Sequence, residues 1–190
     1  MLRVTLQLRY TESTDRGRRL LDVTEYEVDL LGFKEHGEWI EYLDGLSDSR
    51  EGAECRIAVS DLHADDFGGY GEKILDHIRE GYITLEELGF LGEVYAQTGD
   101  ESERVAVLLF AAEFGSEEHM TRFWDRLAGC GPYMEFLDEW LVEENIVAPR
   151  AIDSGLVTIN YDEVDTRMRE GGYRFFDHPD DSDKVIAFVF

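Results

Sequence analysis

The fold of this protein depends most on residues 100–145, DESERVAVLLFAAEFGSEEHMTRFWDRLAGCGPYMEFLDEWLVEEN, because three apolar stripes recur there at helical spacing. The stripes are Val105, Leu108, Leu109 and Ala112, then Met120, Phe123, Trp124 and Leu127, and then Tyr133, Phe136, Leu137, Trp140 and Leu141. Each follows the i, i+3, i+4, i+7 pattern of an amphipathic helix. The other positions of this stretch hold twelve acids and only three bases, so we expect three helices with a strongly negative outer surface.

This negative charge is the dominant property of the chain. Like charges one helical turn apart repel, and the net charge of −25 far exceeds the magnitude of roughly 2–8 that solubility requires of a small domain. Residues 1–34 hold six bases and six acids, so the whole excess lies after them. Nucleic acids and anionic membranes are excluded as direct ligands, and a basic partner is expected. A halophile-style acidic surface without a recognition role is the alternative.

Length and composition indicate a folded protein. The 190 residues are 43% hydrophobic and 12% aromatic, whereas acidic disordered segments are poor in aromatic residues. The two cysteines, Cys55 and Cys130, form neither a disulfide framework nor a zinc ligand set. We see no signal-peptide core and no apolar run of membrane-spanning length, so we expect a cytoplasmic protein.

The first third of the chain predicts a small α+β unit. Apolar and polar residues alternate over 2–9 and 25–30, which predicts two strands separated by a polar turn region at 11–19. A short helix is expected over 35–46, a loop over 47–52 and a third strand over 55–60. The Gly- and Asp-rich stretch 61–72 is expected to be a turn that ends this domain.

The rest of the chain predicts helices followed by a small sheet. A helix begins at Ile74, a capping box of Thr84 and Glu87 opens the next, and a third covers 101–114. Ser116 and Pro132 are expected to begin further helices, and Pro149 to end the acidic block. We then expect a β-like piece at 157–159, a helix over 161–170, a strand over 173–176, a hairpin loop over 178–183 and a strand over 184–190. The predicted fold class is α+β, an elongated chain of three small domains: 1–66 mixed α/β with an antiparallel sheet, 67–112 a small helical bundle, and 113–190 helices plus a β-sheet.

One segment has the pattern of a catalytic metal site. A strand that ends in Asp61-x-His63, with Asp65 and Asp66 close by, is how two-metal phosphoesterase sites begin, but the later ligand segments of such sites are missing. We find no nucleophile elbow, phosphate-binding loop, dinucleotide fingerprint or HExxH motif. Cys130 lies in a predicted turn, GCGP, without an activating histidine nearby in sequence. The sequence therefore predicts no catalytic residues, no bound metal and no cofactor.

The acidic helices suggest imitation of DNA. Carboxylates four residues apart on a helix lie about 6 Å apart along its axis. B-DNA has one charge per roughly 3.4 Å of rise on each strand, so such a ladder is coarsely similar in density. Three hypotheses follow: a DNA mimic that occupies a basic groove, an acidic adaptor or chaperone for basic proteins, and a metal-dependent enzyme that uses Asp61, His63 and Asp65. For the mimic, the predicted contact set is Asp61, Asp65, Asp66, Glu72, Asp76, Glu86, Glu87, Glu93, Glu113, Glu117, Glu118, Glu135, Asp138, Glu139 and Glu143.

From Ile57 to Phe190 the chain resembles the ArdA antirestriction family. The resemblance is carried by IAVSDLHADDFGGYGE (57–72), TLEELGFLGEVYAQTG (84–99), FAAEFGSEE (110–118), INYDEVDTRMREGGYRFF (159–176) and VIAFVF (185–190), in this order. Asn160, Gly172 and Ala112 depart from the residues usual in that family. The resemblance implies three small domains, a homodimer joined through the C-terminal domain, and inhibition of type I restriction–modification enzymes. It also implies a gene carried by a plasmid, a phage or another mobile element; an anti-CRISPR or another inhibitor of a nucleic-acid-binding defence protein is the alternative.

Overall fold

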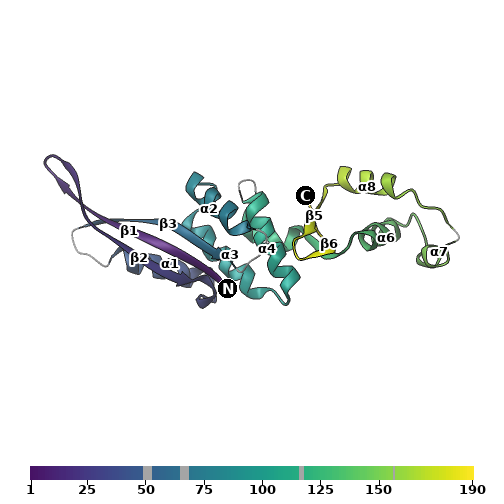
Figure 1. Cartoon of the computed structure of the whole chain (residues 1–190), viewed down its shortest axis with the longest axis horizontal. Coiled ribbons are helices and arrows are strands. Elements are labelled where there is room, and N and C mark those ends of the chain that lie inside the picture. The colour runs from purple at the N-terminus through teal and green to yellow at the C-terminus, as the bar shows by residue number, and fades with distance from the viewer. Residues whose placement is uncertain (49–52, 65–68, 116–117, 156) are drawn as a thin grey trace. The chain divides into compact units, whose positions relative to one another are not determined.

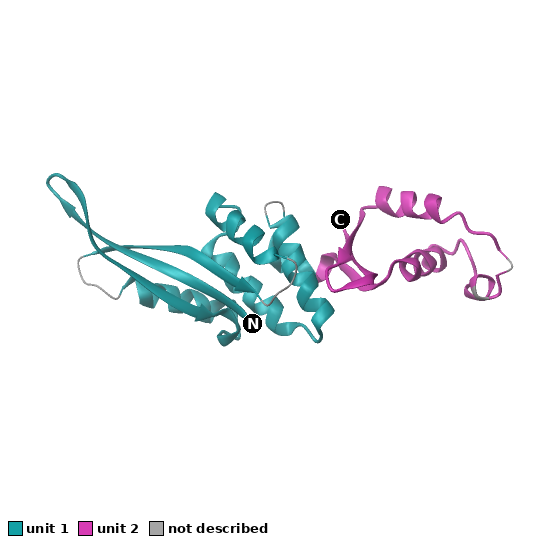
Figure 2. Ribbon diagram, viewed as in Figure 1, with its two compact units in different colours: residues 1–123 teal, residues 124–190 magenta. Residues whose placement is uncertain are grey.

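The computed structural model describes residues 1–48, 53–64, 69–115, 118–155 and 157–190, which divide into two compact units, 1–123 and 124–190 (Figure 2). Both units combine helices with a small antiparallel sheet, so the predicted α+β class is confirmed. The predicted division into three domains is not confirmed. Within the described residues, every helix is too short or too polar to cross a membrane.

The first unit contains a three-stranded antiparallel sheet with the order β2-β1-β3 (Figure 1). Its strands are β1 (Leu2–Thr14), β2 (Gly17–Asp29) and β3 (Glu54–Ala64). The even-numbered residues of β1 from Leu2 to Tyr10 are buried, whereas Arg3, Gln7 and Arg9 point to the opposite face. The predicted alternation is therefore confirmed, and it decides which face of the sheet the helices cover.

Two predictions about these strands are wrong. Residues 11–19, expected as a turn region, mostly continue β1 and β2, and the reversal is made at Asp15-Arg16 with Gly17 at φ +117°. Residues 61–64, expected as the start of a boundary turn, belong to β3 and pair with β1. In both cases backbone hydrogen bonds to a neighbouring strand hold polar residues in a strand, although their side chains contribute little to a core.

Four helices complete the core of the first unit: α1 (His36–Ser47), α2 (Tyr70–Glu80), α3 (Leu85–Gln97) and α4 (Glu101–Phe114). The 3-10 turns η1 (Leu30–Gly32) and η2 (Met120–Arg122) each add one buried residue, Leu30 and Met120. The capping box predicted at Thr84 is confirmed, since both of its hydrogen bonds are present. In α4 every residue from Val105 to Ala112 is buried, so this helix lies inside the unit and has no solvent-exposed face along that stretch.

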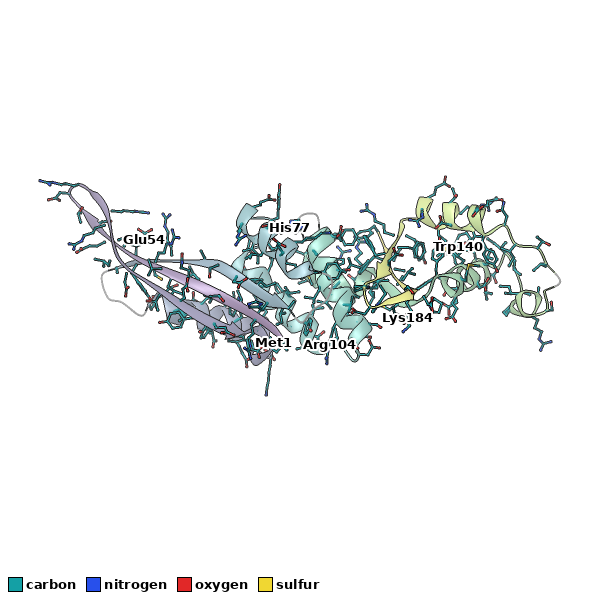
Figure 3. All side chains as sticks on the ribbon, viewed as in Figure 1. Met1, Glu54, His77, Arg104, Trp140 and Lys184 are labelled. Carbon is teal, nitrogen blue, oxygen red and sulfur yellow. The ribbon has the colours of Figure 1, made fainter. Side chains whose placement is uncertain are left out.

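The second unit packs two helices beside a three-stranded sheet with the order β4-β6-β5. Its elements are β4 (Leu127–Pro132), α6 (Tyr133–Glu143), α7 (Pro149–Asp153), α8 (Tyr161–Glu170), β5 (Tyr173–His178) and β6 (Asp181–Val189). Leu137 and Leu141 of α6 meet Val164 and Met168 of α8 in the core. Trp140, labelled in Figure 3, packs against this cluster.

The structure corrects four expectations for this part of the chain. The helix expected around residues 120–127 is reduced to η2 and the four-residue α5 (Phe123–Arg126), and the expected turn around Cys130 is strand β4. Pairing with β6, a partner more than fifty residues away, outweighs the helical spacing of the apolar side chains. Residues 157–159 form no strand, and the hairpin loop at 178–183 shrinks to Pro179-Asp180 because β5 and β6 both extend into it. Pro149 begins α7.

Candidate protein-binding surface of acidic residues

An exposed row of carboxylates runs along α6. Glu135, Glu139 and Glu143, here called the α6 stripe, are all exposed, and α6 contains no basic residue. They stand opposite the buried Leu137 and Leu141, at steps of about 6 Å along the axis. Within the described residues, none of the three forms an ion pair with a base. The stripe is therefore an uncompensated line of negative charge.

Asp138, the fourth acid predicted on this helix, has a structural role. It is only partly exposed and accepts a hydrogen bond of 2.8 Å from the Tyr161 hydroxyl of α8. That hydrogen bond, and to a lesser degree burial, raises the pKa of Tyr161. Asp138 thus helps to hold α6 against α8, and its carboxylate is less available to a partner than those of the α6 stripe.

A second tyrosine–aspartate hydrogen bond joins the same two helices, but here the tyrosine belongs to α6 and the aspartate to α8. Tyr133 of α6 donates its hydroxyl proton to Asp165 of α8, which also accepts from Arg169 Nε at 2.8 and 3.0 Å. Burial raises the pKa of the Asp165 carboxyl, but the hydrogen bonds from Tyr133 and Arg169 outweigh it, so this pKa is lowered. Arg169 also lies 5.3 Å from the centre of the Phe175 ring. This network fixes the spacing between α6 and α8, and with it the direction in which the α6 stripe faces.

Helix α8 contrasts with α6, because bases compensate two of its four acids. Arg167 pairs with Glu163 at 2.6 Å, and Arg169 pairs with Asp165 at 2.8 Å, both one helical turn apart. Such i, i+4 pairs stabilise a helix by about 0.2–0.5 kcal/mol each. The two neighbouring helices therefore differ: α8 has the mixed surface of an ordinary soluble helix, and α6 does not.

In the first unit, the structure leaves four predicted contact residues exposed. Glu72 and Asp76 lie on α2, Glu86 lies on α3, and Asp61 lies on β3. Arg79 pairs with Asp76 at 3.4 Å, so only part of this charge is uncompensated.

Three other predicted contact residues are used inside the first unit. Glu87 is 8% exposed, because its carboxylate completes the capping box and lies 2.9 Å from His119 Nδ1. Glu93 accepts a hydrogen bond of 3.0 Å from the His36 backbone, and Glu113 forms an ion pair with Lys73. The prediction that Glu87 lies on the outer surface is therefore wrong. Glu93 and Glu113 are only partly exposed, so the prediction is partly right for them.

The remaining predicted residues add little to this surface. Glu118 is partly buried and has interactions of its own. Asp65, Asp66 and Glu117 lie outside the described residues, as does Ser116, the expected helix start.

The sequence prediction overlooked a second uncompensated row, on α1. Glu38, Glu41, Asp44 and Asp48, here called the α1 stripe, are exposed and fall within an arc of about 120° at 100° per residue. The buried Trp39 and Leu43 lie on the other side of the helix. The helix has no Lys or Arg, and no salt bridge joins these four acids to a base in the described part of the chain. The signal was visible in the sequence as acids at steps of three and four residues.

The pattern that resembled a metal site is different in three dimensions. Asp61 Oδ2 lies 3.3 Å from His63 Nε2, and both side chains project from one face of β3, where they are 52% and 68% exposed. Among the described residues there is no group of three His, Cys, Asp or Glu side chains that could hold a metal ion. Asp65, the third residue of that hypothesis, is outside them.

Comparisons of this chain with models of protein families, with curated proteins and with solved structures found no match.

Proposed function

We propose that this protein imitates the phosphate backbone of DNA and occupies the DNA-binding groove of a defence protein, most specifically a type I restriction–modification enzyme. The observation that carries the proposal is the α6 stripe: three exposed carboxylates in line on a helix without a base, beside a helix in which bases pair with two of the four acids. The α1 stripe adds a second such line in the first unit.

Electrostatics explains why such a surface favours this function. Uncompensated like charges one turn apart reduce helix stability by about 0.2–0.5 kcal/mol per pair, so the stripes are not explained by folding. A groove lined by Lys and Arg reverses the sign of this contribution, since each carboxylate then meets a cation, as a phosphate would. Steps of about 6 Å along α6 place charges at roughly half the linear density of one DNA strand, with its 3.4 Å rise per phosphate.

The choice of a restriction enzyme rests on the resemblance of residues 57–190 to the ArdA family. In this proposal the protein acts by binding alone, without catalysis or cofactor, in the cytoplasm of a bacterium that holds the mobile element. It forms a homodimer through its C-terminal part, as the family does.

The decisive experiment measures inhibition and competition together. A purified type I restriction enzyme is titrated with the protein, and displacement of a labelled duplex that contains its recognition site is followed. We expect competitive displacement that weakens as salt rises, because the contacts are ionic. Displacement that is insensitive to salt, or inhibition without loss of the bound duplex, would contradict mimicry.

A charge-matched pair of variants tests the α6 stripe. Exposed ion pairs contribute about 0.2–1 kcal/mol each, so the triple variant E135Q/E139Q/E143Q should weaken binding roughly 3- to 150-fold, and each single change only about 1.4- to 5-fold. The control D162N/E163Q/E170Q removes three charges from α8 and should change affinity by less. Equal losses in both variants would show that total charge matters and the stripe does not.

The alternatives predict other outcomes. A CRISPR effector complex that is inhibited while the restriction enzyme is not would identify an anti-CRISPR. Binding of many unrelated basic proteins with similar affinity would support an acidic adaptor or chaperone, the hypothesis from a different class.

A further inference from the structure

The open face of the first sheet carries an arginine cluster at its hairpin end. Arg9 of β1, Arg18 of β2 and Arg56 of β3 border a hollow of about 540 Å³ together with Leu20 and Val23. We call these five residues the arginine face. Leu20 is 57% exposed and Val23 is 43% exposed. Basic and exposed apolar side chains thus lie together on this face of a highly acidic chain.

Helix α1 covers the other face of the same sheet. The Tyr10 hydroxyl donates to the Leu46 carbonyl of α1 at 3.4 Å, and neighbouring residues of a strand point to opposite faces. Arg9, next to Tyr10 in β1, therefore points away from α1. Glu54, labelled near this end of the sheet in Figure 3, marks where the third strand begins.

The sheet places arginines next to one another, so that like charges repel. Arg9 and Arg56 are direct partners across β1 and β3, and like charges in that position destabilise a sheet. Glu54 is shared, at 2.9 Å from Arg18 and 3.6 Å from Arg56. Arg9 donates to the neutral Gln7 at 2.9 Å, and within the described residues it pairs with no acid. Three guanidiniums thus face one carboxylate, and further carboxylates would relieve the repulsion.

The chemistry of the face favours a protein carboxylate over a nucleic acid. Guanidiniums bind carboxylates and phosphates alike, but Leu20 and Val23 stand exposed among them, and arginine with apolar residues is typical of the centre of protein interfaces. The charge of −25 also repels DNA and RNA.

We propose that the arginine face binds the α1 stripe of a second copy of this chain. Each copy carries both surfaces within residues 1–123, on opposite faces of one sheet, so the contact joins copies head to tail: the arginine face of one copy meets the α1 stripe of the next. The α1 stripe supplies four carboxylates over about 15 Å of helix with no base among them. This contact is separate from the dimer expected through the C-terminal part, and it does not depend on the proposed function.

Complementary charge reversals test the proposal. The variants R9E/R56E and E41R/D44R are each expected to lose one association step of the wild type, with affinity lowered roughly tenfold or more. When R9E/R56E labelled with a fluorophore is mixed with E41R/D44R, that step should return, because the reversed surfaces attract each other. Sedimentation velocity and fluorescence anisotropy measure both quantities, and circular dichroism checks folding.

Controls separate this contact from other causes. R104E/R150E makes the same change in net charge at two other exposed arginines and should associate like the wild type. R9Q/R56Q removes the arginine charges without adding acids, and it should also lose the step even if R9E/R56E fails to fold. A dimer through residues 124–190 would survive in all variants.

Several outcomes would overturn the proposal. The wild type could lack the association step, or R104E/R150E could lose it as well. A mixture of R9E/R56E and E41R/D44R that does not associate would also contradict the proposal. If R9E/R56E associated with E135R/E139R/E143R in place of E41R/D44R, the arginine face would bind α6. Binding of duplex DNA that depends on Arg9 and Arg56 would make the arginine face a nucleic-acid site. Either result would refute the contact with α1.

Discussion

Replacing Gly89 with alanine tests how α1 packs on α3. A Cβ atom at Gly89 would lie 2.6 Å from Trp39 Cδ1 and 3.0 Å from His36 Cδ2. Trp39 is fully buried, and its Nε1 donates to the Leu85 carbonyl at 2.6 Å. The ring therefore cannot move aside without losing both its packing and its hydrogen bond.

The expected loss of stability can be worked from these contacts. Overpacking a core costs about 1–3 kcal/mol, and the hydrogen bond contributes about 0.5–1.5 kcal/mol. Alanine returns about 1 kcal/mol, because glycine is unfavourable inside a helix. The net loss for G89A is thus about 0.5–3.5 kcal/mol, with a central value near 2 kcal/mol.

Gly45 provides the matched control, since it lies in α1 and nothing stands within 4 Å of the position of its Cβ. G45A should therefore stabilise the protein by about 0.5–1 kcal/mol. The two substitutions are chemically identical, but they are expected to change the free energy of unfolding in opposite directions.

The assay is urea unfolding followed by the fluorescence of Trp39 in a W124F/W140F background, so that the signal reports the first unit alone. Equal stabilisation by G89A and G45A would refute the close packing of Trp39 on Gly89. It would also mean that the glycine is tolerated in α3 without a packing reason.

Two further predictions concern the helix start of α3 and the network between α6 and α8. T84A should lower the free energy of unfolding by about 0.5–2 kcal/mol because it removes an acceptor of the capping box, whereas T84S should be nearly neutral; equal urea midpoints for the two variants would contradict this. The pKa of Asp165 is lowered in the folded state, so its contribution to the stability of the second unit is present above the ordinary aspartate pKa of about 3.9 and is lost as pH falls through the lower folded value. D165N should therefore unfold more readily at neutral pH and show a shallower loss of stability on acidification, measured by urea midpoints from tryptophan fluorescence at several pH values; an unchanged acid dependence would exclude Asp165 as its source.

Local patterns in the sequence were sufficient for much of the helical structure. The helix over Glu101–Phe114, the capping box at Thr84 and the helix over Tyr161–Glu170 were predicted with the bounds that the structure has. Helical hydrogen bonds and caps join residues three or four positions apart, so the information lies within a short window. The acidic stripe on α6 follows from the same periodicity.

Strands and the environment of individual acids required the tertiary structure. Strand β4 exists because β6, far along the chain, pairs with it, and no short window around Cys130 contains that partner. Likewise, the sequence cannot distinguish Glu139, which is exposed, from Glu87, which is buried against His119, because the difference depends on which distant element packs nearby. The sequence by itself thus determined that this protein has a large negative charge on helical surfaces. Only the tertiary structure decided which carboxylates remain free to meet a partner, since ion pairs and burial depend on contacts between residues that are distant along the chain.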